Sequence, residues 1–477
     1  MADFEAQSAN FLNWFNSIPG ATLHPSLKVV DLRSRNAGRG IIATSPIEPD
    51  AELFVVPRQS IISVENSSLS SKLPQIFSTL KDQAHSNDID EDEIELPDPW
   101  LDLILVMIYE YLQGAASPWK PYFDVLPTNF DTLMFWTESE LSELQASAVR
   151  SKIGKASADE MFSTKVLPTI RAHSSIFYPA GTPHLSDEDL MLLAHRMGST
   201  IMAYAFDLEK DTDDDEANDE EDVWAVDGDG LTSMGMVPVA DLLNADAEFN
   251  AHLHHGDAAL TMTSLRPIAA GEEVLNYYGP LPNCDLLRRY GYTSAKHARY
   301  DVVEMPWETI LSAIRDRFAG KQLGTPEEEE VEDGFVLERE SGEPDETGVN
   351  NYPAKFTGFP EELEMQVYQV VAPAVGIDVG KGRADKAQKL RLKSAFAEVM
   401  ARAIATRQGQ YATSIQQDEE MLRNPAVQGR LRMAVEVRVG EKYLLQESLA
   451  FANEQVEQHR QPVEESGDRP AKKQRTR

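Results

Sequence analysis

Two short motifs near the middle of the chain constrain its fold more strongly than any other feature. The first, Met236–Asp246, reads MVPVADLLNAD, and the second, Asn276–Gly279, reads NYYG and is followed by YGY at Tyr290–Tyr292. Each is an apolar run that ends in a polar residue where the backbone is expected to turn. Asn244 alone would most simply be a cap or turn residue, and Tyr278 alone a core residue. Their order behind a glycine-rich turn instead predicts that the motifs form one site.

Charge and hydropathy narrow the possible partners. The chain has 477 residues and a formal net charge of −35, which repels phosphate backbones and anionic lipids and favours basic proteins. We therefore expect no direct binding of nucleic acid. The most apolar run, Trp100–Leu112, contains Asp102 and Glu110 and is too short to cross a bilayer. It is expected to be a buried helix, and no membrane role is predicted.

Cysteine content and the ends of the chain bear on location. The single cysteine, Cys284, cannot form an internal disulfide, and residues 1–20 lack the basic flank and apolar core of a secretory signal. A reducing compartment is therefore expected. The only basic cluster, Arg469–Arg477, fits a nuclear-import signal and a solvated, unstructured end equally well. The nucleus is the expected location, with the cytoplasm as the second.

Hydrophobic periodicity predicts a β fold that is split by helices. Leu27–Leu32 and Glu52–Pro57 favour strands on either side of the turn Arg35–Gly40, and strand patterns return at Ala259–Leu265 and Glu273–Tyr278. Helical patterns occupy Trp100–Leu112, Glu138–Arg150, Ala158–His173 and Asp187–Phe206. Because the glycine turn leads into a strand and not into a helix, a doubly wound nucleotide-binding fold is not expected.

The length predicts two domains. The strand and helix patterns together predict the α+β class. The expected divisions are an N-terminal helix at 1–24, a mainly β domain at 25–292 with a helical insertion at about 66–235, a connecting segment at 293–350, a helical domain at 351–460 and a basic disordered tail at 461–477. The connecting segment is expected to contain an acidic linker, Thr325–Glu346. Asn424-Pro425 should separate two helices of the last domain.

These motifs resemble those of the SET-domain lysine methyltransferases, in the group that contains the plant Rubisco large-subunit methyltransferase. Trp119–Pro127, WKPYFDVLP, is similar to the W-x-P-Y-F-x-x-L-P run of that group, and Tyr411–Leu422 and Arg430–Lys442 resemble its substrate-binding domain. The resemblance covers nearly the whole chain and is strongest with the fungal ribosomal-protein lysine methyltransferases. It implies a mainly β SET fold with a pseudoknot, followed by an all-α substrate-binding domain.

The resemblance also implies a cofactor, S-adenosylmethionine, and the residues around it. Tyr278 is implied as the catalytic hydroxyl beside the transferred methyl group. The implied cofactor-binding residues are Arg39, Gly40, Ile41, Asn244, Ala245, Tyr278 and Tyr290. The implied walls of the substrate channel are Tyr204, Asp241, Tyr277 and Tyr292. Such a channel would accept the lysine stem and favour its neutral amine by desolvation, so that no strong side-chain base is required.

Two positions depart from the family pattern. The family commonly has Asn-His where this chain has Asn244-Ala245, which removes one side-chain hydrogen bond but leaves the backbone contacts. The arginine that some members carry in the helix before the acidic loop has no counterpart in Met202–Tyr204. Both departures bear on the affinity for the cofactor and not on the fold.

Other candidate sites are weaker. The run His252–His255 lacks a second ligand cluster and is expected in an exposed turn, so no metal site is predicted. The aspartates of Asp211–Asp215 imitate a calcium loop, but Glu216 stands where that loop needs glycine. Two acidic loops, Asp82–Asp98 and Glu209–Asp222, are solvated insertions in the simplest interpretation. The second has ten carboxylates in fourteen residues, and the alternative is that it attracts a lysine-rich substrate.

Together these patterns predict an S-adenosylmethionine-dependent protein-lysine N-methyltransferase. The expected substrate is a basic protein, namely a 60S ribosomal protein that is monomethylated, and the enzyme is expected to be a monomer. The alternative is a catalytically weak SET-like binding module for a basic protein partner, which the pair Asn244-Ala245 favours. The joint presence of the glycine turn, Asn244 and Tyr278 favours the enzyme.

Overall fold

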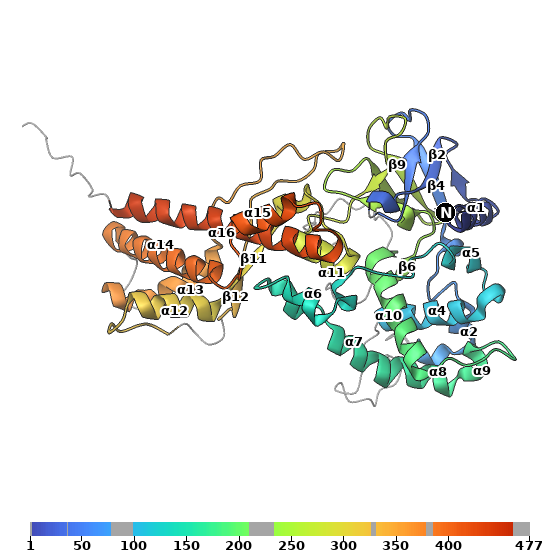
Figure 1. Ribbon diagram of the computed structural model, residues 1–477, viewed down its shortest axis with the longest axis horizontal. Helices are drawn as coiled ribbons and strands as arrows, with labels where there is room; N and C mark the ends of the chain where they lie inside the picture. Colours follow the sequence, from blue (N-terminus) through green and yellow to red (C-terminus); the bar gives the residue numbers. More distant parts are fainter. Residues whose placement is uncertain are drawn as a thin grey trace, which may run out of the picture.

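The β fold and the C-terminal helices form the two parts of an elongated molecule (Figure 1). The computed structural model describes residues 2–35, 37–77, 99–208, 233–325, 331–377 and 385–460. Both acidic loops, with the imitated calcium loop, and the tail at 461–477 lie outside the described residues. Each part has a large hydrophobic core of its own. Within the described ranges, no helix has the length and apolar character needed to span a bilayer.

The main sheet of the first part joins strands that are far apart in the sequence. Its order is β1-β4-β9-β8, with antiparallel neighbours throughout. The strands are β1 (Thr22–Leu23), β4 (Glu52–Pro57), β8 (Ala251–His255) and β9 (Ala259–Ser264). A second antiparallel pair joins β2 (Leu27–Asp31) to β3 (Arg39–Ala43). Because β4 pairs with β9 across the whole helical insertion, the predicted split of the β fold is confirmed.

A short parallel pair aligns the two central motifs. β7 (Asn244–Ala245) lies beside β10 (Leu275–Asn276), and an isolated bridge joins Ile42 of β3 to Glu273. The strand predicted up to Tyr278 is therefore shorter than expected, and Tyr278 lies just beyond β10. Three segments that are distant in the sequence thus meet at one edge.

Two expectations about turns are wrong. Arg39 and Gly40 belong to β3, because the chain has already turned at the 3₁₀ segment Arg33–Arg35 and at Gly38, whose φ is 63°. The run His252–His255 lies on β8, where it alternates between exposed and buried positions as an edge strand does. In the described part of the chain, no group of three His, Cys, Asp or Glu side chains is arranged to hold a metal ion.

Helices of the insertion and α1 (Ala2–Asn16) pack around the first core. α4 (Pro99–Gln113) is buried along its centre, as its apolar composition predicts, and α10 (Asp187–Tyr204) buries apolar side chains at helical spacing, among them Leu190, Ala194, Met197 and Ile201. The other helices are α2 (Ser68–Lys72), α5 (Lys120–Phe123), α6 (Glu138–Ser142), α7 (Lys155–Met161), α8 (Leu167–Ala172) and α9 (Ser174–Phe177). The insertion ends in the antiparallel strands β5 (Ala205–Asp207) and β6 (Met234–Met236).

The helix predicted over Glu138–Arg150 is interrupted. α6 ends at Ser142, and Gln145 has a left-handed backbone conformation with φ 54°. The side chain of Gln145 is held by the second part of the molecule: its Oε1 accepts from the backbone N–H of Ala412 at 3.0 Å, and its Nε2 donates to Thr413 Oγ1 at 2.9 Å. A tertiary contact therefore overrides the helical periodicity.

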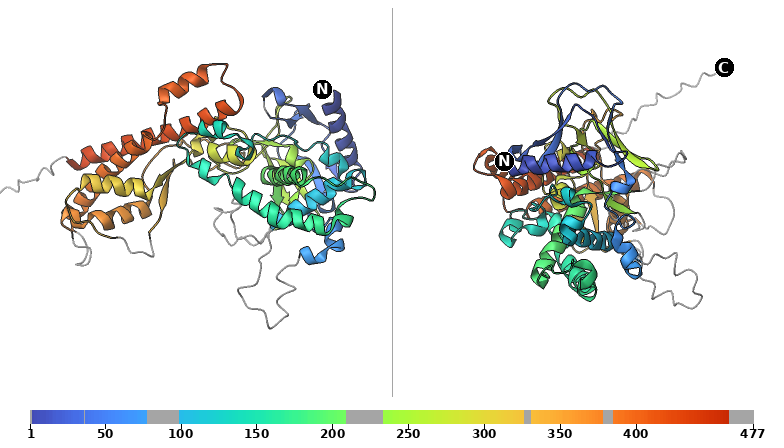
Figure 2. Two further views of the ribbon diagram at one scale, coloured as in Figure 1. Left: turned by 60° about the horizontal axis from the view of Figure 1, so that its bottom comes forward. Right: turned by 90° about the vertical axis from the view of Figure 1, so that its right-hand side faces the viewer.

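The second part begins earlier in the chain than the sequence suggests. β11 (Val303–Pro306) pairs antiparallel with β12 (Gly334–Leu337), and α12 (Trp307–Arg317) packs into the second core. The sequence predicts only a connection with an acidic linker at residues 293–350. The structure instead places ordered elements there, and alternate residues of β12 are buried. The remaining helices are α13 (Glu361–Val371), α14 (Lys386–Gln408), α15 (Ile415–Arg423) and α16 (Gly429–Arg460). As predicted, α15 and α16 are separate, and α14 packs along α16 (Figure 2).

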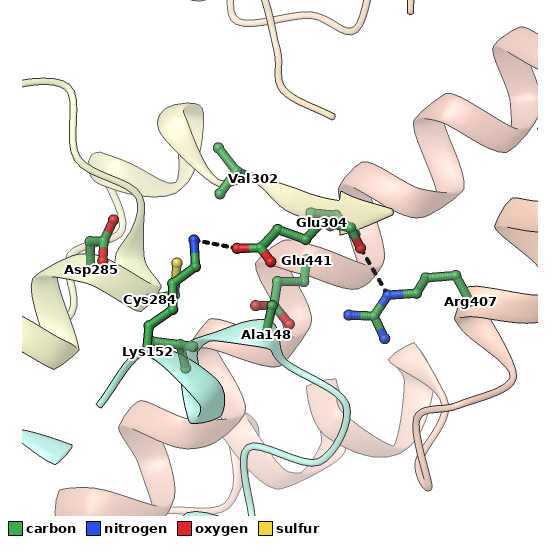
Figure 3. Close-up of a pocket in the computed structure, with 10 residues that line it drawn as sticks. Ala148, Lys152, Cys284, Asp285, Val302, Glu304, Arg407 and Glu441 are labelled. Carbon is green, nitrogen blue, oxygen red and sulfur yellow. Dashed lines mark hydrogen bonds and ion pairs between the residues drawn. The ribbon is translucent and has the colours of Figure 1, made fainter. Parts of the chain in front are cut away.

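α11 (Asn283–Tyr290) links the two parts. A small third core packs Leu287 of α11 against Trp136 of the insertion and Val437 of α16. Cys284, in the first turn of the same helix, lines a cavity of about 30 Å³, which has room for water (Figure 3). The last residue of α11 is Tyr290, so this junction fixes the position of a predicted site residue.

Glu441 of α16 is a buried carboxyl group beside this cavity. It accepts hydrogen bonds from Ser147 Oγ at 2.5 Å and from the Tyr411 hydroxyl at 2.7 Å. Burial raises the pKa of Glu441 to about 7, although these two hydrogen bonds favour the ionised form. The folded protein therefore keeps a proton on Glu441 at pH values at which the unfolded chain has already released it.

Glu441→Gln should reduce the pH dependence of stability. A raised carboxyl pKa contributes stability that is complete below the ordinary pKa of 4.5 and is lost as the pH rises to about 7. The free energy of unfolding should fall from pH 5 to pH 8 in the unsubstituted protein and fall less in the variant, as measured by urea denaturation. Glu454→Gln, an exposed position on the same helix, is the control; an equal slope in all three proteins would contradict the assignment.

Candidate active site

Aromatic rings from the second motif and from α11 form one cluster. Tyr278 and Tyr290 are stacked, with ring centroids 4.4 Å apart and an interplanar angle of 12°. Tyr292 lies 6.3 Å from Tyr290. The chain reverses between them at Gly291, whose φ is 78° and where a Cβ would lie 2.8 Å from the backbone of Asp131. The tyrosines predicted from the second motif and its continuation therefore come together.

Hydrogen bonds attach this tyrosine cluster to the first motif. The Tyr278 hydroxyl donates to the Leu243 carbonyl oxygen at 3.2 Å, and the Tyr292 hydroxyl donates to the Ala245 carbonyl oxygen at 3.2 Å. These two carbonyls flank Asn244 in the sequence. The tyrosine cluster and the parallel pair β7–β10 thus form one continuous wall.

Burial keeps the hydroxyls of the cluster neutral. Desolvation raises the pKa values of Tyr278 and Tyr292 and raises the pKa of Tyr290 to about 12. Tyr204, the last residue of α10, has its pKa raised to about 12 by burial and by the charge of Asp241. All four rings remain partly exposed, as the lining of a channel must be. Neutral phenols in such a lining can donate hydrogen bonds at physiological pH.

Asp241 is a buried carboxyl group in the turn that precedes Asn244. Its Oδ2 accepts from the Tyr122 hydroxyl at 2.6 Å, whereas its Oδ1 has no hydrogen-bond partner among the described residues. Burial raises the pKa of Asp241 to about 7. In the same turn Val239 has φ 75° and ψ −45°, which is strained for a β-branched residue. An unpaired buried oxygen and backbone strain in one turn are typical of a functional site.

Gly40, Asn244 and a glutamate meet at the other end of the wall. Asn244 Nδ2 donates to Glu273 Oε1 at 2.7 Å and to the Arg39 carbonyl oxygen at 3.3 Å. A Cβ on Gly40 would lie 2.8 Å from Glu273 Oε1 and 2.9 Å from Asn244 Nδ2. Glycine is therefore required here by the close approach of side chains and not by its φ. The sequence did not single out Glu273, because it is one of two adjacent glutamates after a turn.

Arg39 and Ile41 reach this junction only through their backbone. The Arg39 guanidinium lies 3.8 Å from the centre of the Phe4 ring and donates to the Val125 carbonyl oxygen at 2.9 Å and to Ser8 Oγ at 3.0 Å. The Ile41 side chain is buried in the first core. Arg39, Gly40 and Ile41 are the three residues of this segment that are predicted to bind the cofactor. Of these, only Gly40 has its α-carbon facing the Asn244 side chain.

Tyr277 lies outside the tyrosine cluster and packs against other aromatic residues. Its ring stacks on Phe249 with centroids 4.5 Å apart, and its pKa is raised by burial and by Tyr300. Adjacent residues of an extended segment point to opposite sides, so Tyr277 and Tyr278 cannot both face the cluster. Tyr277 is therefore not part of the tyrosine cluster, and its role as a channel wall stays a prediction. Tyr122, whose run WKPYFDVLP was noted in the sequence, is the neighbour of Asp241 that the sequence did not identify.

Comparison with known proteins matches both parts of the chain. Residues 38–279 match the SET domain, and residues 380–445 match the Rubisco LSMT substrate-binding domain. Ribosomal lysine N-methyltransferase 4 of Saccharomyces cerevisiae is 32% identical over 325 residues, which are 67% of this chain and 62% of that protein. The alignment therefore spans less than two thirds of the yeast protein. N-lysine methyltransferase SETD6 of Rattus norvegicus is 27% identical over 472 residues, 93% of this chain and 90% of the relative.

Solved structures agree with the observed fold. A crystal structure of the SET domain of LSMT bound to lysine and AdoHcy has a TM-score of 0.61 and 18% identity, and covers 96% of this chain and 93% of its own. Rubisco LSMT bound to AdoMet has a TM-score of 0.59 and 18% identity, over 95% and 93% of the two chains. The predicted SET fold with a helical C-terminal domain is confirmed.

Fold and site together define a SET protein with a separate C-terminal helical domain. Because the SET match covers more than half of the sequence, the chain belongs to the SET domain family. Residues 380–445 of its second part are similar to the Rubisco LSMT substrate-binding domain.

Gly40→Ala should destabilise the junction of β3 with Asn244 and Glu273. The new methyl group would lie within 3 Å of both side chains and of Leu32 Cδ1, and overpacking of this kind costs about 1–3 kcal/mol. The measurement is the free energy of unfolding by urea denaturation.

Gly358→Ala is the matched control, since a Cβ at that position meets no atom within 4 Å and the backbone is unstrained. Equal stability of Gly40→Ala and the unsubstituted protein would show that the junction is looser than the contacts indicate.

Proposed function

We propose that this chain is an S-adenosylmethionine-dependent protein-lysine N-methyltransferase that adds one methyl group to a lysine of a large-subunit ribosomal protein. One observation carries the proposal: the Tyr278 hydroxyl and the Asn244 amide, from separate motifs, converge on the parallel pair β7–β10. The lysine N-methyltransferases among the relatives support the same activity, and the yeast relative is named as a ribosomal enzyme. The net charge of −35 favours a basic substrate.

The residues around Gly40 and Asn244 fit the cofactor. Gly40 lets the side chains of Asn244 and Glu273 approach the backbone of β3 closely, which brings the Asn244 amide to the backbone of Arg39. We assign cofactor binding to the backbone of Arg39–Ile41 and Ala245, to the Asn244 amide and to the ring of Tyr290. When bound, S-adenosylmethionine supplies a methyl group on a positively charged sulfur atom.

The tyrosine cluster orients the amine of the substrate lysine. The Tyr278 hydroxyl is neutral and is held by the Leu243 carbonyl, so its oxygen lone pairs are available to the amine and its position is fixed before the reaction. Tyr204 and Tyr292 line the path of the aliphatic stem and exclude water. Exclusion of water lowers the pKa of the lysine amine, which favours the neutral nucleophile.

Asp241 adds negative charge near this channel. Because its pKa is raised to about 7, the carboxyl group is ionised above that pH. Tyr122 holds one carboxylate oxygen, and the other, unpaired among the described residues, can accept a hydrogen bond from a lysine ammonium group. Asp241 would therefore attract the cationic lysine before its amine loses a proton to water.

Methyl transfer to purified large-subunit ribosomal proteins tests the proposal, with tritiated S-adenosylmethionine as donor and core histones as the comparison. Tyr278→Phe should lower kcat by about 100-fold, the scale of removing one preorganised hydroxyl from a reacting centre. The fold should persist, because the ring still stacks on Tyr290.

Tyr352→Phe, at an exposed tyrosine whose hydroxyl bonds Glu340, is the control and should keep full activity. Full activity of Tyr278→Phe would remove its assigned role. Labelling of histones alone would refute the ribosomal substrate, and more than one methyl group by intact mass would refute monomethylation. If no protein is labelled, the alternative of a binding module is favoured.

Asp241→Asn should weaken binding of the basic substrate and leave binding of the cofactor unchanged. Asparagine keeps an oxygen for the Tyr122 hydroxyl but cannot ionise, so kcat/KM for the protein substrate should fall about tenfold at pH 8. The rise of kcat/KM as the pH passes about 7 should also disappear, because that rise follows ionisation of Asp241. An unchanged pH profile in the variant would exclude this role.

We further propose that the protein is a monomer, that it is located in the nucleus, and that it binds neither membranes nor nucleic acid. The nuclear location rests on the basic tail Arg469–Arg477, which lies outside the described residues.

A further inference from the structure

We propose that Glu273 is a positioning residue for the cofactor: its carboxylate fixes the side-chain amide of Asn244. The inference rests on the proposed function, because it assigns Asn244 to the cofactor. Glu273 belongs to neither central motif. Its role follows from contacts among three segments that are distant in the sequence.

The first step is the geometry of the Asn244 amide. An asparagine amide nitrogen has two hydrogens, and here one is donated to Glu273 Oε1 at 2.7 Å and the other to the Arg39 carbonyl oxygen at 3.3 Å. Both donors are therefore directed toward the protein. The amide carbonyl oxygen, on the opposite side of the same plane, is left to accept a hydrogen bond from a bound group.

The second step is that Glu273 is itself held rigidly. The backbone at Glu273 bridges Ile42 of β3, and the Val274 N–H donates to the Ile41 carbonyl oxygen at 2.8 Å. Arg35 does not contribute to this, because its guanidinium nitrogen lies 3.7 Å from the second carboxylate oxygen, too far for a hydrogen bond. The Glu273 side chain is only 17% exposed. A fixed carboxylate can hold the orientation of the Asn244 amide, which a mobile surface glutamate could not do.

The third step is the space that Gly40 provides. Any side chain there would press on both the Glu273 carboxylate and the Asn244 amide. Glycine at position 40 thus permits the hydrogen bond between them. The contacts that orient the Asn244 amide are the hydrogen bonds to Glu273 and to the Arg39 carbonyl oxygen.

Calorimetric titration of the full chain with S-adenosylhomocysteine tests the inference without measuring activity. Glu273→Ala should raise the Kd about tenfold, and Glu273→Gln, which keeps an acceptor oxygen, should stay within about threefold of the unsubstituted protein. Asn244→Ala should weaken binding at least as much as Glu273→Ala. The double variant should be no weaker than Asn244→Ala alone, because Glu273 acts through Asn244.

Arg35→Ala is the matched control, since it removes the neighbouring charge and leaves the hydrogen bond to Asn244; its Kd should not change.

If Glu273→Ala does not fold, Glu273→Met replaces it, with a similar length and no oxygen acceptor. Unchanged binding by the alanine or methionine variant would overturn the inference. Equal losses in the alanine and glutamine variants, or additive losses in the double variant, would overturn it too, because Glu273 would then act by charge or independently of Asn244. Failure of the unsubstituted protein to bind would instead refute the proposed function.

Discussion

The parallel pairing of β7 with β10 is the constraint on which the rest of the site depends. Only two residues of each strand take part, with Asn244 opposite Leu275 and Ala245 opposite Asn276. This register places Tyr278 where its hydroxyl reaches the Leu243 carbonyl, and a shift by one residue would reverse the side of every neighbouring side chain. Two strands this short are not stable alone, so β3 and the surrounding core must hold them in register.

Burial of polar groups sets the chemistry of this region. Desolvation raises the pKa values of the tyrosine hydroxyls further above physiological pH, and the same effect raises the pKa of Asp241 to about 7. An environment that keeps phenols protonated also favours an uncharged lysine amine. Under the proposed function, the cluster would therefore orient the lysine amine without a strong base, and Asp241 would attract the lysine in its cationic form.

Much of the fold and about half of the site could be predicted from the sequence. The split β fold, the buried helix α4, and the convergence of Gly40, Asn244 and Tyr278 followed from periodicity, motif order and family resemblance. Gln145 breaks a predicted helix because it bonds residues of the other part, which no local pattern records. Tyr277 and Tyr278 are adjacent and chemically alike, so only the backbone direction shows which one joins the cluster. Glu273 and Tyr122 acquire their roles from partners more than twenty residues away.

We expect the glycine of β3, the asparagine of β7 and the tyrosine beyond β10 to surround a single ligand. A crystal structure of the full chain with S-adenosylhomocysteine would show whether they do. Electron density for the ligand should lie against Gly40 and Asn244, with the sulfur atom directed toward the Tyr278 hydroxyl. Density for the ligand elsewhere in the molecule, with this wall unoccupied, would rule out the arrangement.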